Sequence, residues 1–260
     1  MKLSSYESTE SLMYLFKSES GCGKTTAIGS FPEPIYIFSC DGRVAPLKNN
    51  PLTKDRNIEF DIYTDYSAIV RKLEELEKHC PYKTVAIDPL TGFARVAIGH
   101  LFNNRGISKK EDDKSPRSVG GIPIMGINEY NGESSAIASM LLSLRIIRNH
   151  EVNTILTTHV VTSEARQLDG RYITTRRLLT GGNKIAAEIP AYFDEVYHFY
   201  GKEPGLSDIA KYRAVTSNAG EDFARTSFYG LQQEIDFTGK LFYEELIHAI
   251  EASRIEKNSL

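Results

Sequence analysis

A short run of small residues, one lysine and two threonines follows an apolar segment near the start of the chain. The run is Ser18-Glu19-Ser20-Gly21-Cys22-Gly23-Lys24-Thr25-Thr26, and the apolar segment covers residues 12–16. Glycines let backbone N–H groups turn toward a polyphosphate, and a helix beginning near Lys24 would point the positive end of its dipole at the same anion. In such a loop Lys24 reaches the β- and γ-phosphates and Thr25 binds Mg²⁺. We therefore predict a site for ATP and Mg²⁺ formed by Ser20, Gly21, Cys22, Gly23, Lys24, Thr25 and Thr26.

The match to the pattern G-x-x-x-x-G-K-[ST] is incomplete, because Ser18 stands at the first glycine. That position mainly shapes the turn out of the strand, and serine serves there if its φ stays negative. The alternative interpretation is a glycine-rich turn that happens to precede a helix. Cys22 in the loop is either a small filler or a reactive thiol beside a lysine.

Two aspartates follow apolar segments that read as strands. Asp88 comes after residues 84–87, where a phosphate-loop ATPase needs a carboxylate for the Mg²⁺ shell; its alternative role is a helix N-cap or a turn. Many ATPases place a water-polarising glutamate next, but here the next residue is Pro89. The base must therefore lie elsewhere. Asp41, which follows residues 35–38, is the candidate, and its alternative role is a turn-forming Asp-Gly pair.

His159 comes directly after a further strand, predicted over residues 154–158. At that position a polar side chain can sense the γ-phosphate and pass the signal to the adjoining segment; the alternative is a hydrogen-bonded structural histidine. The predicted catalytic residues are thus Lys24, Asp41 and His159, and the predicted metal ligands are Thr25 and Asp88.

Strand-like and helical segments alternate along most of the chain. Apolar runs predict strands at 12–16, 35–38, 58–63, 84–87, 154–158, 195–200 and 210–216. Apolar periodicity and capping signals predict helices at 24–30, 66–79, 92–102, 129–149 and 240–257, with a short helix opening at 181–183. This alternation predicts right-handed crossovers and a mainly parallel sheet that binds its ligands at the carboxyl ends of the strands.

Two further segments lie between these elements. Residues 103–126 are polar and read as a long loop, and residues 161–180 alternate weakly around Asp169-Gly170, which indicates a β-ribbon. We predict one domain over residues 1–260, with these two segments as flexible loops and residues 240–260 as a C-terminal helix and tail.

Composition narrows the class of protein. The 260 residues, 41% of them hydrophobic, are enough for one α/β core. No apolar run reaches 18 residues and residues 1–10 are polar, so we expect a cytoplasmic protein without membrane contact. Cys22, Cys40 and Cys80 lack metal-ligand spacing, so we expect neither a disulfide nor zinc. The net charge of −3 means that any contact with nucleic acid must be local.

The order of these parts resembles the RecA-like recombinase ATPases, and more closely the phage nucleotide-binding proteins of that kind that act in single-strand annealing and recombination. Five elements carry the resemblance, which covers most of the chain: residues 21–26, Asp41, residues 84–88, His159 and residues 180–183. It implies an α/β P-loop NTPase with a RecA-like core, in which a mainly parallel central sheet is flanked by helices.

The chain also departs from that family. Ser18 replaces a glycine, Asp41 is shorter than the usual glutamate, and His159 replaces a glutamine that couples ATP to DNA. These three departures bear on the rate of hydrolysis. We also expect no N-terminal oligomerisation domain before the core, and such a domain is what RecA-type filaments use.

The resemblance implies two loops that bind single-stranded DNA. Each candidate loop carries two more basic than acidic residues: 103–126 includes Lys109 and Lys110, and 161–180 includes Arg166, Arg171, Tyr172, Arg176 and Arg177. Arginine beside an aromatic ring suits phosphate and base contacts, although a charged run is also typical of a solvated surface. In a homo-oligomer, a ring or a filament, a basic residue of the next subunit would complete the active site, with Lys211, Arg213 and Arg225 as candidates.

The residues and the resemblance together favour an ATP-dependent factor that binds single-stranded DNA in phage-type recombination, annealing or replication, with a possible single-strand-binding or replication partner. Two alternatives stay open. One is a P-loop small-molecule kinase, for which residues 161–180 would be an arginine-rich lid. The other is an assembly or remodelling ATPase that acts on protein.

Overall fold

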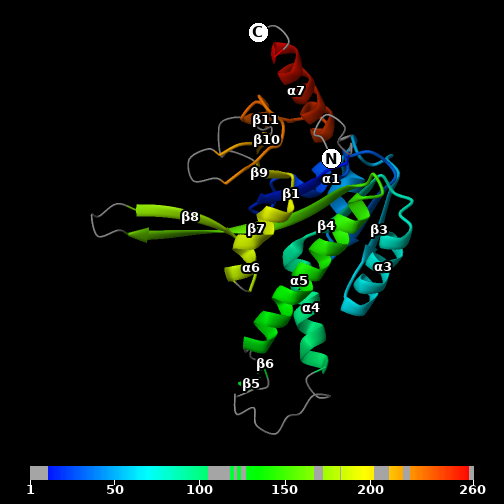
Figure 1. Cartoon of the computed structure of the whole chain (residues 1–260), viewed down its shortest axis with the longest axis vertical. Helices are drawn as coiled ribbons and strands as arrows, with labels where there is room; N and C mark the ends of the chain where they lie inside the picture. The colour runs from blue at the N-terminus through cyan, green and yellow to red at the C-terminus, as the bar shows by residue number, and fades with distance from the viewer. Residues whose placement is uncertain are drawn as a thin grey trace, which may run out of the picture.

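The computed structural model describes residues 11–104, 118–119, 122–123, 127–166, 172–181, 183–201, 211–218 and 223–257. Figure 1 shows a sheet with helices on both faces. The strands are β1 Met13–Ser18, β2 Ile35–Ser39, β3 Ile58–Ile62, β4 Thr84–Asp88, β5 Ser118–Val119, β6 Ile122–Pro123, β7 Asn153–Arg166, β8 Tyr172–Leu178, β9 Glu195–Gly201, β10 Tyr212–Val215 and β11 Glu234–Asp236. The helices are α1 Lys24–Ile28, α2 Ala45–Asn49, α3 Tyr66–Lys78, α4 Leu90–Asn104, α5 Ile127–Arg148, α6 Asn183–Glu188, the 3₁₀ helix η2 Ile189–Tyr192 and α7 Phe242–Lys257.

The main sheet is mostly parallel, as the alternation of strands and helices predicts. Its strand order is β11-β10-β9-β1-β7-β4-β2-β3, with β8 paired to β7 outside this path. The six strands from β9 to β3 are parallel to their neighbours, whereas β10, β11 and β8 join antiparallel. Since β1 lies between β7 and β9, the segment that follows it emerges from the middle of the sheet.

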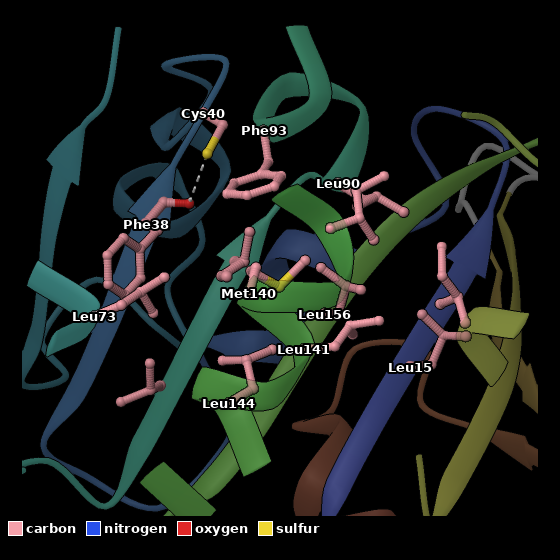
Figure 2. Close-up of a cluster of buried hydrophobic side chains, with 14 of the residues drawn as sticks. Leu15, Phe38, Cys40, Leu73, Leu90, Phe93, Met140, Leu141, Leu144 and Leu156 are labelled. Atoms are coloured by element: carbon pink, nitrogen blue, oxygen red, sulfur yellow. Dashed lines mark hydrogen bonds between the residues drawn. The ribbon is translucent and has the colours of Figure 1, made fainter. Parts of the chain in front are cut away.

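Two apolar layers hold the helices against the sheet. One face packs against α3, α4 and α5, where Met140, Leu141 and Leu144 of α5 are fully buried over Leu15 and other strand residues, as Figure 2 shows. The other face packs an aromatic cluster against α7, in which the ring centroids of Phe16 and Phe242 are 5.6 Å apart. Because both faces are covered, the central strands are apolar on both sides.

Helix α3 illustrates how local sequence sets an element. The Asp65 side chain accepts a hydrogen bond of 3.1 Å from the Ser67 N–H and caps the helix. Ile69, Leu73 and Leu76 recur at helical spacing and are buried. Capping and periodicity together therefore determine this helix.

The structure differs from the predicted elements in several places. The strand predicted to end at His159 continues to Arg166 as the first arm of the ribbon, because β8 pairs with it from Val160 onward. Helices α2 and η2 and strand β11 were not predicted. Within 103–126, predicted as loop, the structure describes the end of α4 and the strand pair β5 and β6. The turn predicted at Asp169-Gly170 lies outside the described residues.

Candidate functional site

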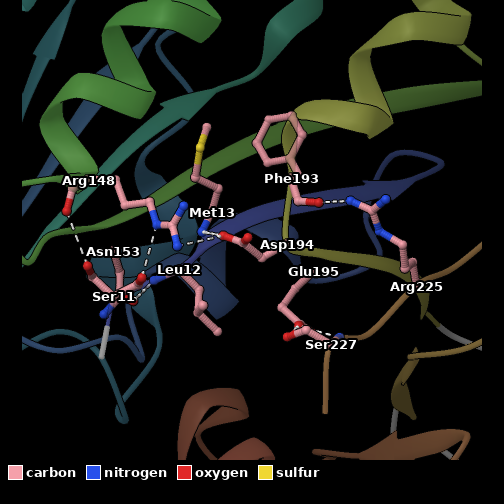
Figure 3. A network of polar contacts seen from close by, with 10 residues as sticks. All are labelled: Ser11, Leu12, Met13, Arg148, Asn153, Phe193, Asp194, Glu195, Arg225 and Ser227. Atoms are coloured by element: carbon pink, nitrogen blue, oxygen red, sulfur yellow. Dashed lines mark hydrogen bonds and ion pairs between the residues drawn. The ribbon is translucent and has the colours of Figure 1, made fainter. Parts of the chain in front are cut away.

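The amino end of β1 is held by side chains from β7, from α5 and from the residue before β9, as Figure 3 shows. The Leu12 N–H donates to Asn153 Oδ1 at 3.1 Å, and the Met13 N–H donates to Asp194 Oδ2 at 2.9 Å. The Arg148 guanidinium lies 3.6 Å from the same Asp194 carboxylate. The strand is thereby held at one end, and its other end presents the loop of residues 19–23.

The loop adopts a backbone that its glycines permit. Gly21 and Gly23 have φ values of +84° and +86°, in the left-handed region that other residues avoid. A Cβ on Gly23 would also lie 3.1 Å from Cδ1 of Tyr212. The conformation therefore favours glycine at position 23, and a Cβ there would also press on the Tyr212 ring.

Lys24 is buried beneath this loop. Its ammonium donates to the Ser18 hydroxyl at 2.6 Å and to the carbonyl oxygens of Glu19 and Ser18 at 2.8 and 3.3 Å. Burial lowers the pKa of Lys24 to about 8, although the nearby Cys22 and Asp88 oppose the shift. Ser18, the departure from the glycine pattern, thus supplies a hydroxyl partner for the loop lysine.

Asp88, at the end of β4, accepts hydrogen bonds at both carboxylate oxygens. Thr25 Oγ1 donates to Oδ2 at 2.7 Å, and Thr157 Oγ1 of β7 donates to Oδ1. Burial raises the pKa of Asp88, while the hydrogen bonds from Thr157 and Thr25 oppose this shift. The structure thus brings together the two predicted metal ligands and adds Thr157, which only the pairing of distant strands reveals.

Asp41 lies just beyond the carboxyl end of β2, and both of its alternative roles fit the geometry. Its Oδ1 accepts from the Arg43 N–H at 3.0 Å, as in a turn, and Gly42 has a φ of +74°. The same side chain lines the cavity beside the loop, together with Arg43. The turn therefore keeps the Asp41 carboxylate at the wall of the cavity, beside the loop.

His159 lies on β7 beside the end of β1, paired in register with Ser18. Its Nδ1 is 3.0 Å from Thr91 Oγ1 on α4. Burial and then the nearby Lys24 ammonium lower the pKa of His159, so the ring is neutral at pH 7. The ring thus connects β7 to α4 at the wall of the cavity.

These side chains surround one cavity of about 330 Å³. All the residues predicted for ATP, catalysis and metal line it: Ser20, Gly21, Cys22, Gly23, Lys24, Thr25, Thr26, Asp41, Asp88 and His159. Sequence reasoning missed Arg43, Pro46, Pro89 and Tyr212. Arg43 and Pro89 lie shortly after predicted strand ends, and Pro46 lies on α2, which was not predicted. Tyr212 reaches the cavity because β10 pairs with β9.

The donor set fits a nucleotide with its divalent cation. Left-handed glycines flank Cys22 in the loop, a buried ammonium lies beneath it, and a hydroxyl and a carboxylate lie 2.7 Å apart beside it. Backbone amides and an ammonium match phosphate oxygens, and oxygen ligands suit Mg²⁺.

The residues predicted to bind DNA divide into three groups. Arg176 and Arg177 lie on β8 at the root of the ribbon, and Arg176 Nη1 donates to the Tyr200 hydroxyl at 3.2 Å. Arg166 and Tyr172 pair in register at the far end of the described part of the ribbon. Lys109, Lys110 and Arg171 lie outside the described residues.

The three basic residues considered for action on a neighbouring subunit have different surroundings. Arg213 forms an ion pair of 3.0 Å with Glu234 across β10 and β11. Lys211 is exposed just before β10. Arg225 donates to the carbonyl oxygens of Phe193 and Pro190, so it anchors the backbone before β9.

The fold and this site define an ATPase-type P-loop domain. The family model described as an AAA domain matches residues 10–228, and the chain belongs to that family. The predicted fold class, an α/β P-loop NTPase with a RecA-like core, is thereby confirmed. Domains of this type use a nucleotide and Mg²⁺.

Other comparisons add less. A KaiC-like protein from the hyperthermophilic archaeon Pyrococcus horikoshii OT3 is a structural neighbour with 14% identity and a TM-score of 0.46, covering 87% of this chain and 84% of that one. No curated protein matches the chain. Within the described part of the chain, no helix has both the length and the apolar composition to cross a membrane.

Proposed function

We propose that this chain binds and hydrolyses ATP and binds single-stranded DNA through the ribbon of β7 and β8, in phage-type recombination, annealing or replication. One observation carries the proposal. Strand β7 runs without a break from Asn153 to Arg166, so His159 in the cavity and the ribbon belong to one strand. Figure 1 shows this ribbon projecting away from the sheet.

The cavity residues have separate roles in this proposal. Lys24 and the loop N–H groups hold the β- and γ-phosphates. The dipole of α1 is given no part in phosphate binding, because this helix has only five residues. Thr25 and Asp88 hold Mg²⁺, which neutralises charge on the phosphate oxygens when bound. Asp41 accepts a proton from the attacking water, a role that Pro89 cannot fill.

His159 couples the cavity to the ribbon. Its contact with Thr91 and its register with Ser18 expose it to changes in the loop. From Val160 to Arg166 the strand is paired with β8, so a displacement at His159 moves both arms of the ribbon together. The basic residues of the ribbon then change their position relative to bound DNA.

A homo-oligomer would complete the site. Tyr212 lines the cavity from β10, and adjacent strand residues point to opposite faces. Arg213, the next residue of β10, therefore points away from the cavity of its own subunit, and Lys211 is exposed just before the strand. Both positions suit contact with the nucleotide of a neighbour. Arg225 is the weaker candidate because its guanidinium is engaged by backbone carbonyl groups.

Turnover assays test the proposal and its alternatives. ATP hydrolysis is measured alone, with single-stranded DNA, and with a panel of nucleoside monophosphates. We expect stimulation by DNA and no phosphoryl transfer to a nucleotide. Transfer to a nucleoside monophosphate would instead identify a kinase, and indifference to both additions would favour an ATPase that acts on protein.

Two sets of variants assign the roles. Lys24→Ala abolishes ATP binding in a calorimetric titration, and unaltered affinity would remove the nucleotide assignment. The double variant Arg176→Ala and Arg177→Ala lowers DNA affinity in fluorescence anisotropy while ATP affinity is kept. Lys184→Ala, on the neighbouring α6 with a side chain that is 92% exposed, is the matched control.

A further inference from the structure

A second cavity, of about 590 Å³, lies at the root of the ribbon, and none of its lining residues belongs to the nucleotide cavity. Its walls come from β1, β8, α6, η2 and the segment that precedes Arg225. Four of the lining residues are basic: Lys17, Arg176, Arg177 and Arg225. Among the described residues that line it, none is acidic. The cavity therefore has a strongly positive wall.

The rest of the lining is apolar and made mostly of small side chains. Ala186 and Ala187 of α6 and Pro190 and Ala191 of η2 form a low surface beside Leu178. Phe223 lies at the rim with 46% of its surface exposed. A flat ring can pack on such a surface, because these side chains have no polar atoms that need a hydrogen-bond partner.

Aromatic rings accompany the cations here. Lys17 is only 4% exposed, and its ammonium lies 5.6 Å from the centroid of the Phe223 ring. On the next strand His198, which pairs in register with Lys17, stacks on Tyr200 at 4.5 Å between centroids. The Arg176 guanidinium lies 6.0 Å from the Tyr200 centroid. Cationic and aromatic groups therefore continue from the sheet into the ribbon.

We propose that this cavity binds one nucleotide unit of single-stranded nucleic acid, its phosphate held by Lys17, Arg176 and Arg177 and its base stacked on Phe223. Basic groups that follow a backbone beside rings that stack on bases are the combination used by single-strand binders. That the ligand is single-stranded nucleic acid rests on the proposed function. The cavity adds a defined pocket that the ribbon alone does not provide.

The cavity lies next to the nucleotide loop, because one of its lining residues, Lys17, directly precedes Ser18. Lys17 lines the second cavity, and the next residue, Ser18, accepts the hydrogen bond from the Lys24 ammonium at 2.6 Å. Successive side chains of β1 point to opposite faces of the sheet. A phosphate bound at Lys17 therefore acts on the strand that carries the ATP loop.

The test compares two 20-nucleotide strands, an oligodeoxythymidine and an abasic strand with the same phosphates, by fluorescence anisotropy with ATP present. Phe223→Ala weakens binding of the thymidine strand about tenfold and leaves the abasic strand unchanged, because only stacking is lost. Lys17→Met weakens the binding of both strands. It also reduces the steepness of log K against log salt by about 0.7, the value for one phosphate contact on a single strand. Arg177→Gln, an exposed position, acts in the same direction without risk to the core.

The controls separate the possible failures. Lys184→Met removes one charge from neighbouring α6 outside the cavity and leaves both affinities unchanged, and thermal melts check that each variant is folded. If the wild-type protein binds neither strand, the proposed function and this inference both fail. If the wild type binds but folded Phe223→Ala binds the thymidine strand equally well, this inference alone is wrong. Loss of poly-glutamate binding in Arg177→Gln, without an effect on DNA, would assign the cavity to an acidic peptide.

Discussion

Two threonines on β7 should respond in opposite ways to the same substitution. Thr157 Oγ1 donates to the buried Asp88 carboxylate, whereas Thr154 Oγ1, equally buried, has no hydrogen-bond partner among the described residues. Thr157→Val and Thr154→Val each replace a hydroxyl by a methyl group on the same strand and keep a β-branched side chain. The pair therefore isolates the contribution of the bond to Asp88.

The expected magnitudes follow from the environment. Thr157→Val leaves Asp88 Oδ1 without this donor and lowers the free energy of unfolding by about 1–3 kcal/mol. At about 2–4 °C per kcal/mol for a chain of this size, the midpoint of melting falls by several degrees. Thr154→Val removes a buried hydroxyl without a partner, so stability is unchanged or rises by about 1 kcal/mol.

The effect of Thr157→Val also depends on pH. The folded pKa of Asp88 lies above 3.8, and the hydrogen bond from Thr157 lowers it. Without that bond the folded pKa rises further, and the folded state binds more protons than the unfolded state over a wider range above 3.8. Stability therefore falls more with rising pH in the variant, and its deficit shrinks as the pH is lowered.

Denaturant titrations followed by circular dichroism at several pH values from about 4 to 8 measure these differences, because the folded pKa of Asp88 lies above 3.8. We also expect Thr157→Val to weaken binding of ATP in the presence of Mg²⁺, because Asp88 is more readily protonated. Equal stability losses in the two variants, or a deficit for Thr157→Val that does not change with pH, would refute the assignment of this hydrogen bond.

Two further predictions follow from the loop lysine and from α4. The pKa of Lys24 is about 8 in the folded state against 10.5 in the unfolded state, so the free energy of unfolding rises as the pH rises through that window. Over the same window the ammonium loses its proton, so ATP affinity falls above about pH 8. Calorimetric titration of ATP at pH 7 to 9 checks this, and an affinity that does not change with pH would contradict it. On α4, Gly92→Ala lowers stability by about 1–3 kcal/mol, because its Cβ would lie 2.7 Å from the Cys40 carbonyl oxygen, whereas Gly99→Ala, with nothing within 4 Å, raises it by about 0.5–1 kcal/mol. Chemical denaturation of both variants measures the difference, and a common sign would be inconsistent with the close approach of α4 to the Cys40 backbone that follows β2.

Local pattern was sufficient for the parts of the site that lie at strand ends. Gly21, Gly23 and Lys24 follow an apolar strand, and Asp41 and Asp88 each follow another. Carboxyl ends of parallel strands meet at one edge of a sheet, so these residues converge once the alternation of strands and helices is recognised. The residues of the loop and both aspartates could therefore be predicted.

Contacts between distant segments required the folded chain. Thr157 meets Asp88, and Tyr212 meets Gly23, only because of how strands are ordered in the sheet. The β-ribbon predicted over residues 161–180 is confirmed by the pairing of β7 with β8, but its first arm continues the strand predicted over 154–158 without a break, which the sequence pattern did not indicate.

The amino-acid sequence by itself determined the class of the protein, since the phosphate-binding loop and the strand-end aspartates are encoded over a few adjacent residues each. Tertiary structure alone decided what surrounds Lys17, which in the sequence is one lysine after an apolar run. Its neighbours in the cavity, on β8, α6, η2 and at Phe223, all lie 159 or more positions away along the chain. Which residues so far apart in the chain bury one another or bring their charges together depends on the topology of the sheet. A local sequence pattern carries no information about those contacts.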